Sequence, residues 1–173
     1  YQLGSKLNTP EVYGKHFILY GLTQQDLNGD GTPETIILDN GYHLRVYSEN
    51  GKLIVKSNDY YGHDPRLIEV GVEEDVSGTV LGTPVRLKGR LEFVQIGSNQ
   101  FLVLPMNKIM GNGLISRLVV PESSGLAVLR VTGEGFEKAF ESSKQKGFMA
   151  ASRVVPHKNG KGARVYTLRI DKD

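Results

Sequence analysis

The chain has 173 residues and a mass of 19.1 kDa, enough to bury a core as one domain without disulfides. It has no cysteine, which excludes disulfides and zinc–thiolate sites and leaves the cellular compartment open. Its 21 basic and 19 acidic residues are scattered and give a net charge of +2, so nucleic acid and anionic membranes are disfavoured partners. No stretch approaches the roughly 20 apolar residues of a membrane span.

Turn dipeptides such as Asn-Gly recur between short β-branched and aromatic runs, which is typical of an all-β domain. The start at Tyr1 suggests an excised segment of a longer protein, with residues 1–15 ending a preceding unit. A four-stranded meander is predicted within 16–59, with strands at 17–23, 35–38, 43–47 and 53–57. Its turns at Asn40-Gly41 and Asn50-Gly51 predict type I′ geometry, which needs positive φ at both central residues.

The rest of the chain predicts a repetition of this unit. Glycines and prolines across 60–84 indicate a long loop with room for one extra strand. A second unit within 85–146 is predicted to have strands at 85–93, 101–104, 126–131 and 136–142, with an excursion over Met106–Ser124. Its final hairpin, 126–142, repeats the pattern of 43–57, and each ends on a serine. A third unit within 147–173 stops after two strands, at 148–155 and 164–170.

Repeated four-stranded meanders are typical of propeller blades, each of which buries its faces against its neighbours. The sequence therefore predicts an all-β fold of β-propeller-type blades, about two full blades with partial blades at both ends. Closed propellers need about four blades or more, so this chain is short of a ring. Its unpaired blade edges favour assembly with other chains.

The nine-residue segment from Asp26 to Glu34 carries the clearest chemistry. Oxygen-bearing side chains occupy its positions 1, 3, 5 and 9: Asp26, Asn28, Asp30 and Glu34. Calcium takes about six to eight oxygen ligands, the carbonyl of Thr32 at position 7 can add one, and Gly31 permits the sharp turn. An EF-hand is disfavoured because position 12 is Ile37, in a β-branched run. The sequence therefore predicts a calcium loop that joins two strands.

Two alternatives to calcium remain open for this loop. Magnesium is a poorer candidate because it keeps its waters and prefers rigid octahedral geometry. A plain polar turn would also use Asn, Asp and Gly. Such a turn does not require Asp26 and Glu34 as well, and three carboxylates within nine residues repel one another unless a cation neutralises them.

The loop and its flanks resemble a known repeat family. Gly21-Leu-Thr-Gln-Gln-Asp-Leu-Asn-Gly-Asp-Gly-Thr-Pro-Glu-Thr-Ile-Ile-Leu38, followed by Leu44-Arg-Val-Tyr-Ser-Glu-Asn-Gly-Lys-Leu53, is similar to an FG-GAP/VCBS repeat of integrin-α-type β-propellers. The likeness covers about residues 16–58, and the remaining chain is more loosely similar to the C-terminal blades of bacterial envelope proteins with such repeats. The resemblance implies calcium ligands at Asp26, Asn28, Asp30, Thr32 and Glu34.

The other two units depart from this pattern. The connection Ile96–Gln100 is short and lacks acidic residues, so no ion is expected there. The connection that begins at His157 resembles a degraded copy in which Lys161 replaces Asp30. An ammonium group at that position could supply the charge of a cation, and no metal is expected at this loop.

The sequence predicts the function less specifically than it predicts the metal site. The family is usually non-enzymatic, so we expect a calcium-stabilised binding or structural module of an extracellular or bacterial envelope protein, with a protein or glycan ligand. An aromatic and polar cluster, Tyr60, Tyr61, His63 and Asp64, is a candidate binding surface. The alternative is a hydrolase or lyase on a propeller scaffold that uses the loop around His63 and Asp64.

Overall fold

The computed structural model describes residues 21–62, 67–74, 80–86, 90–110, 120–133 and 135–171. Within these ranges every regular element is a β-strand, and the strands pair antiparallel, so the predicted all-β class is confirmed. The sheets form no closed barrel in this part of the chain. The same residues contain no helix long and apolar enough to cross a membrane.

The first sheet is the predicted four-stranded meander. Its strands follow the chain in order: β1 (Leu22–Gln25), β2 (Glu34–Leu38), β3 (Leu44–Tyr47) and β4 (Leu53–Lys56). The predicted first strand, 17–23, is only partly tested because residues 17–20 lie outside the described ranges. All five residues of β2 are buried, and after Glu34 its β-branched and apolar run, Thr35–Leu38, is that expected of a central strand covered on both faces.

The second sheet is also a meander, in the order β10-β9-β8-β7. Its strands are β7 (Glu92–Ile96), β8 (Asn99–Met110), β9 (Val120–Thr132) and β10 (Gly135–Glu141), and the short β11 (Gln145–Lys146) also pairs with β9. Two expectations need correction. The first strand begins at Glu92 rather than at 85, and β8 and β9 continue to pair as far as Met110 and Val120, within the predicted excursion 106–124. The Pro and Ser residues there look like loop residues but are accommodated in the strands.

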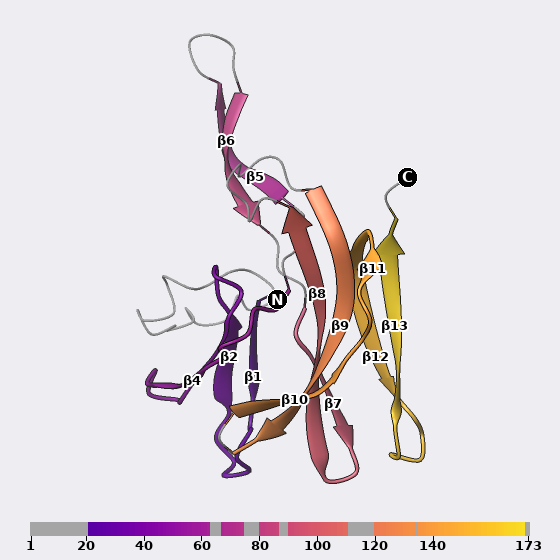
Figure 1. Cartoon of the computed structure of the whole chain (residues 1–173). Helices are drawn as coiled ribbons and strands as arrows, with labels where there is room; N and C mark the ends of the chain where they lie inside the picture. The colour runs from indigo at the N-terminus through magenta and orange to yellow at the C-terminus, as the bar shows by residue number, and fades with distance from the viewer. Residues whose placement is uncertain are drawn as a thin grey trace, which may run out of the picture.

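Two further hairpins lie within the described ranges. β12 (Phe148–Pro156) and β13 (Ala163–Ile170) confirm the two strands predicted for the third unit. β5 (Leu67–Glu74) and β6 (Val80–Arg86) form a hairpin where the sequence predicted a long loop over 60–84. This hairpin accepts Pro84 because, within the described ranges, β5 and β6 pair only with each other, so each has one edge without a ladder partner there. Figure 1 shows this hairpin extending away from the other sheets.

The two Asn-Gly turns of the first sheet are not type I′. At each, a β-turn is followed by one residue with positive φ, which makes a three-residue loop. That residue is Gly51 (φ 75°) in one loop and Tyr42 (φ 63°) in the other. The closing bonds run from the Tyr42 N–H to the Asp39 carbonyl, and from the Gly51 N–H to the Ser48 carbonyl. The dipeptides therefore marked the hairpins correctly, but only Gly51 among their four residues has the predicted positive φ, and in the first loop Tyr42 has it instead.

The hairpins 43–57 and 126–142 repeat each other in detail. In the first, Ser57 donates its N–H to the Leu44 carbonyl, and its Oγ accepts the Leu44 N–H at 2.9 Å. In the second, Ser142 makes the same two bonds with Leu126, with its Oγ 2.8 Å from the Leu126 nitrogen. Each outer strand also carries a one-residue bulge at the same place, at Ile54 and at Ala139. The predicted sequence repeat is therefore also a structural one.

The two sheets stack in the same orientation. Leu44 belongs to a core shared with the second sheet, whereas its equivalent, Leu126, belongs to a separate core shared with β12. Equivalent faces of the two sheets therefore point the same way along the stack rather than toward each other. The second sheet lies between the first sheet and β12 (Figure 1).

Two buried polar side chains of the second sheet form hydrogen bonds with neighbouring segments of the fold. The amide of Asn107, on β8, donates to the carbonyls of Gly62 and Met149 and accepts the Met149 N–H. The carboxylate of Glu92, on β7, accepts the Val154 N–H at 2.7 Å. Each side chain is under 9% exposed and ties the second sheet to backbone groups at least 42 residues away.

Candidate functional site

The candidate metal loop connects β1 to β2. Gln25 pairs with Glu34, so residues 26–33 form the turn of an antiparallel hairpin. Thr35 lies within β2, and no helix begins there, which confirms that the loop joins two strands. Gly29 and Gly31 have φ values of 79° and 87°, which residues with a Cβ atom rarely adopt. These two residues let the loop curl back on itself.

The polar side chains of this loop fold inward onto its own backbone. Asp26 accepts the N–H groups of Gly29 and Gly31, at 2.7 Å and 3.0 Å. Asn28 Oδ1 accepts the Asp30 N–H at 2.9 Å. Asp30 Oδ1 in turn accepts the Thr32 N–H at 2.7 Å. The loop is therefore held in one curled shape by its own acidic and amide groups.

Three of the predicted ligand side chains converge on one point. The Nδ2 of Asn28 lies 2.9 Å from Asp30 Oδ2 and 3.0 Å from Glu34 Oε1, so both carboxylates meet at one donor. The other oxygen of Glu34 accepts the Leu27 N–H at 2.8 Å, and this side chain is buried. Asp26 and Thr32 lie beside this group. Asp26 accepts two backbone N–H groups of the loop, and the Thr32 N–H donates to Asp30.

The electrostatics of the loop favour a cation. In the described part of the chain, no Lys, Arg or His forms an ion pair with Asp26, Asp30 or Glu34. The Thr32 N–H, followed by the Asn28 side chain, holds the pKa of Asp30 below its ordinary value, so this carboxylate is ionised at neutral pH. Asp30 and Glu34 thus meet at Asn28, and Asp26 belongs to the same loop, without a basic partner from the described residues.

The donor set fits a hard divalent cation. No three His, Cys, Asp or Glu side chains in the described ranges gather closely enough to hold a metal by themselves. Calcium sites also use amide and carbonyl oxygens, which Asn28 and Thr32 provide. The loop is therefore a candidate cation site, for which Asn28, Asp30 and Glu34 are the central residues.

The third unit contains a related loop between β12 and β13. Asn159 Oδ1 accepts the Lys161 N–H at 3.0 Å, matching the bond between Asn28 and Asp30. Gly160 has a φ of 66°, close to that of Gly29. The loop therefore keeps the local turn but carries an exposed lysine in place of the aspartate. The second unit makes the same connection with only Gly97 and Ser98 between β7 and β8.

The aromatic cluster is only partly placed. Tyr60 is 59% exposed, and its ring centroid lies 4.5 Å from that of His43. Tyr61 instead belongs to the core between the sheets, where burial raises the pKa of its hydroxyl to about 12. His63 and Asp64 lie outside the described residues. Of this candidate surface, the structure therefore shows Tyr60 accessible and Tyr61 turned into the core.

Sequence reasoning missed a hollow near the C-terminal hairpin. Its walls include Ser124 on β9 and Met149 on β12, together with Thr167 and Arg169 on β13. No motif marked these residues, because they come together only when β12 and β13 pack beside the second sheet.

No protein-family model matches this chain, and no curated protein or solved structure resembles it significantly.

Proposed function

We propose that this chain is a calcium-stabilised, non-catalytic binding and structural module, built of FG-GAP/VCBS-type propeller blades, of an extracellular or bacterial envelope protein. The convergence of Asn28, Asp30 and Glu34 is the observation that supports this proposal most strongly. When bound, calcium would supply positive charge beside the Asp30 and Glu34 carboxylates, which have no basic partner among the described residues. The ion stabilises structure in this proposal and takes no part in a reaction.

The position of the loop explains what calcium would stabilise. The loop sets the register of β1 against β2, and every residue of β2 is buried. A cation that draws Asp30 and Glu34 together fixes the hairpin at the point where the central strand begins. Sites in extracellular modules bind calcium at about 10⁻⁴ to 10⁻³ M, which suits an ion that is abundant outside cells.

The blade-like repetition supports the structural half of the proposal. The first two sheets share strand order, bulge position and closing serine, and they stack in one orientation. Units stacked in this way bury their faces against their neighbours, as propeller blades do. The third unit contributes two strands, β12 and β13, in the described part of the chain.

Calcium is expected to raise the melting temperature of the chain. At a free concentration about 100 times the Kd, ligand binding stabilises the native state by about 2.7 kcal/mol, or roughly 5–10 °C for a domain of this size. The measurement is thermal unfolding followed by circular dichroism in excess chelator, in calcium and in magnesium. Calcium should give the larger rise.

The matched variant is Asp30→Asn, which keeps an oxygen for the Thr32 N–H but removes the charge. In chelator it should melt at or above the wild-type temperature, because repulsion within the loop is weaker. In calcium it should lose most of the rise. Equal melting temperatures of the wild type in calcium and in chelator would overturn the proposal.

A further inference from the structure

Charge is divided unevenly between the units of the fold. Residues 142–170, which contain β11, β12 and β13, carry seven basic residues and no acidic one. Since the whole chain has 21 basic and 19 acidic residues, the rest of it carries 14 and 19. A surface with such an excess of one sign attracts ligands of the opposite sign. The seven basic residues are Lys144, Lys146, Arg153, Lys158, Lys161, Arg164 and Arg169.

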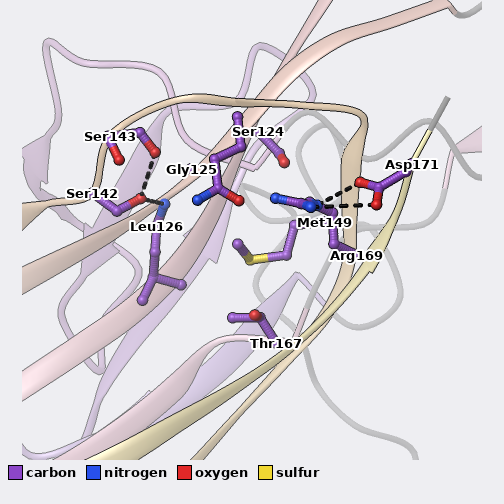
Figure 2. A pocket seen from close by; sticks show the side chains of 10 residues that line it. Ser124, Gly125, Leu126, Ser142, Ser143, Met149, Thr167, Arg169 and Asp171 are labelled. Atoms are coloured by element: carbon purple, nitrogen blue, oxygen red, sulfur yellow. Dashed lines mark hydrogen bonds and ion pairs between the residues drawn. The ribbon is translucent and has the colours of Figure 1, made fainter.

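Two of these seven cations are already paired with carboxylates of the chain. Arg153 binds Glu92 at 3.0 Å. Arg169 binds Asp171 at 2.6 Å, as Figure 2 shows. The other five are exposed and form no ion pair with a described residue. These five are Lys144 and Lys146, in or next to β11, and Lys158, Lys161 and Arg164, at the connection between β12 and β13.

Three of the unpaired cations lie together in the basic loop, residues 157–164. Lys158 and Lys161 lie between the two strands, and Arg164 is the second residue of β13. Every residue of the basic loop except Gly162 and Ala163 is exposed. The three positive charges are therefore accessible at one end of the hairpin.

This end of the stack stays open to solvent in the other two units as well. Figure 1 shows the first hairpin loop of each unit at the same end of the stack. Residues 28–31 of the first unit and 97–99 of the second are exposed, although each of these units has a following unit packed beside it. A further unit packed beside β13 would therefore leave the basic loop accessible too.

The residues around the basic loop indicate the class of ligand. Gly160 accepts the Gly97 N–H at 3.1 Å, so the basic loop adjoins the loop of the second sheet. Residues 97–99 and 157–162 include no aliphatic, Phe, Tyr or Trp side chain. Protein interfaces bury apolar or aromatic anchors, and proteins that bind single-stranded nucleic acids stack the bases on aromatic rings. Cations beside neutral polar groups instead suit a ligand that carries both negative charges and hydroxyl groups.

We infer that the basic loop binds an acidic polysaccharide, with Lys158, Lys161 and Arg164 contacting its carboxylate or sulfate groups. Asn159 uses its Oδ1 within the loop, which leaves its two amide N–H donors for hydroxyl groups of the sugars. The Ser98 hydroxyl, on the adjoining loop, is exposed and adds a further donor. An exposed loop encloses little of a ligand, so affinity comes from several charge contacts along one polymer.

The inference rests on the proposed function as an extracellular or envelope binding module, because it names the ligand class of that module. It does not depend on calcium. The candidate metal loop and the basic loop belong to different units of the fold.

The test uses the full chain in excess chelator and two fluorescein-labelled hexasaccharides, followed by fluorescence anisotropy. Hexagalacturonate presents carboxylates, and a heparin hexasaccharide also presents sulfates. We expect saturable binding of at least one of them, with slower hydrogen exchange within residues 157–164. Raising the salt concentration from about 20 to about 200 mM should weaken binding at least roughly tenfold. The uncharged methyl ester of hexagalacturonate should not bind measurably.

Two double variants separate the basic loop from the net charge of the unit. Lys158→Gln with Lys161→Gln should weaken binding roughly tenfold, because two charge contacts are lost. Lys144→Gln with Lys146→Gln removes the same charge at the other end of β12, whose nine residues span roughly 30 Å. At about 0.1 M salt this control should change binding less than about twofold, because the Debye length is only about 10 Å. All four lysines are exposed, so neither double variant should lower the melting temperature.

The inference fails if neither hexasaccharide binds, or if the two double variants lose affinity equally. It also fails if a hexaglutamate peptide or a six-nucleotide single-stranded DNA binds more tightly, which would assign the basic loop to an acidic protein or to nucleic acid. Because every titration is made in chelator, absence of binding together with a calcium-dependent rise in melting temperature would contradict only this inference. Binding without that rise would contradict only the calcium site.

Discussion

Replacing Asn107 with alanine is expected to lower the free energy of unfolding by about 3 kcal/mol. Its Nδ2 donates to the carbonyls of Gly62 and Met149, at 3.3 Å and 3.1 Å, and its Oδ1 accepts the Met149 N–H at 2.8 Å. Asn107 is 4% exposed, so truncation takes the side-chain acceptor from the Met149 N–H, while the Gly62 carbonyl keeps only the bond from the Asn107 backbone N–H. The substitution should therefore loosen the first sheet, the second sheet and β12 together.

Equilibrium unfolding in urea measures this loss, with Asn99→Ala as the control. Asn99 begins β8 in an exposed position, so its replacement should change stability by less than about 0.5 kcal/mol. If Asn107→Ala had the same urea midpoint as the wild type, the side-chain amide of Asn107 would not be holding these three segments together.

Replacing Glu92 with alanine should cost about 2–3 kcal/mol and detach the C-terminal hairpin first. The Glu92 carboxylate accepts the Val154 N–H at 2.7 Å and binds Arg153 at 3.0 Å. The Arg153 side chain is 64% exposed, so the ion pair itself contributes little. Most of the loss comes from the buried Val154 N–H, which is left without an acceptor.

Native-state hydrogen exchange locates the effect. In Glu92→Ala, exchange should quicken over β12 and β13 before it quickens in the first sheet. Arg153→Ala, which removes only the exposed partner, should cost less than about 1 kcal/mol. Equal losses in the two variants would show that the ion pair, rather than the backbone bond, carries the interaction.

The strands of the meanders could be predicted from sequence because their signals are local. The run Thr35–Leu38 is β-branched and apolar, and the dipeptides at Asn40 and Asn50 mark the adjacent hairpins. Strand β6 was missed because Gly82 and Pro84 are typical of loops, although a two-stranded hairpin tolerates them. Turn type was also missed, since the Asn-Gly pair alone does not determine whether two or three residues form the loop.

The metal loop was accessible from sequence for the same reason. Its candidate ligands lie within nine residues, and their spacing alone suggests convergence. The anchors Asn107 and Glu92 were not predicted, because their partners lie 42 to 62 residues away and depend on how the sheets stack. The hollow beside Arg169 has the same origin, since it is formed by strands from different units.

Calcium binding to the loop is tested most directly by isothermal titration calorimetry on the full chain. We expect one ion per chain with a Kd of about 10⁻⁴ to 10⁻³ M, no saturable binding by Asp30→Asn, and unchanged binding by Glu49→Gln, which removes an exposed carboxylate outside the loop. Absence of saturable binding in the wild type, or the same stoichiometry in Asp30→Asn, would contradict a calcium site built on Asn28, Asp30 and Glu34.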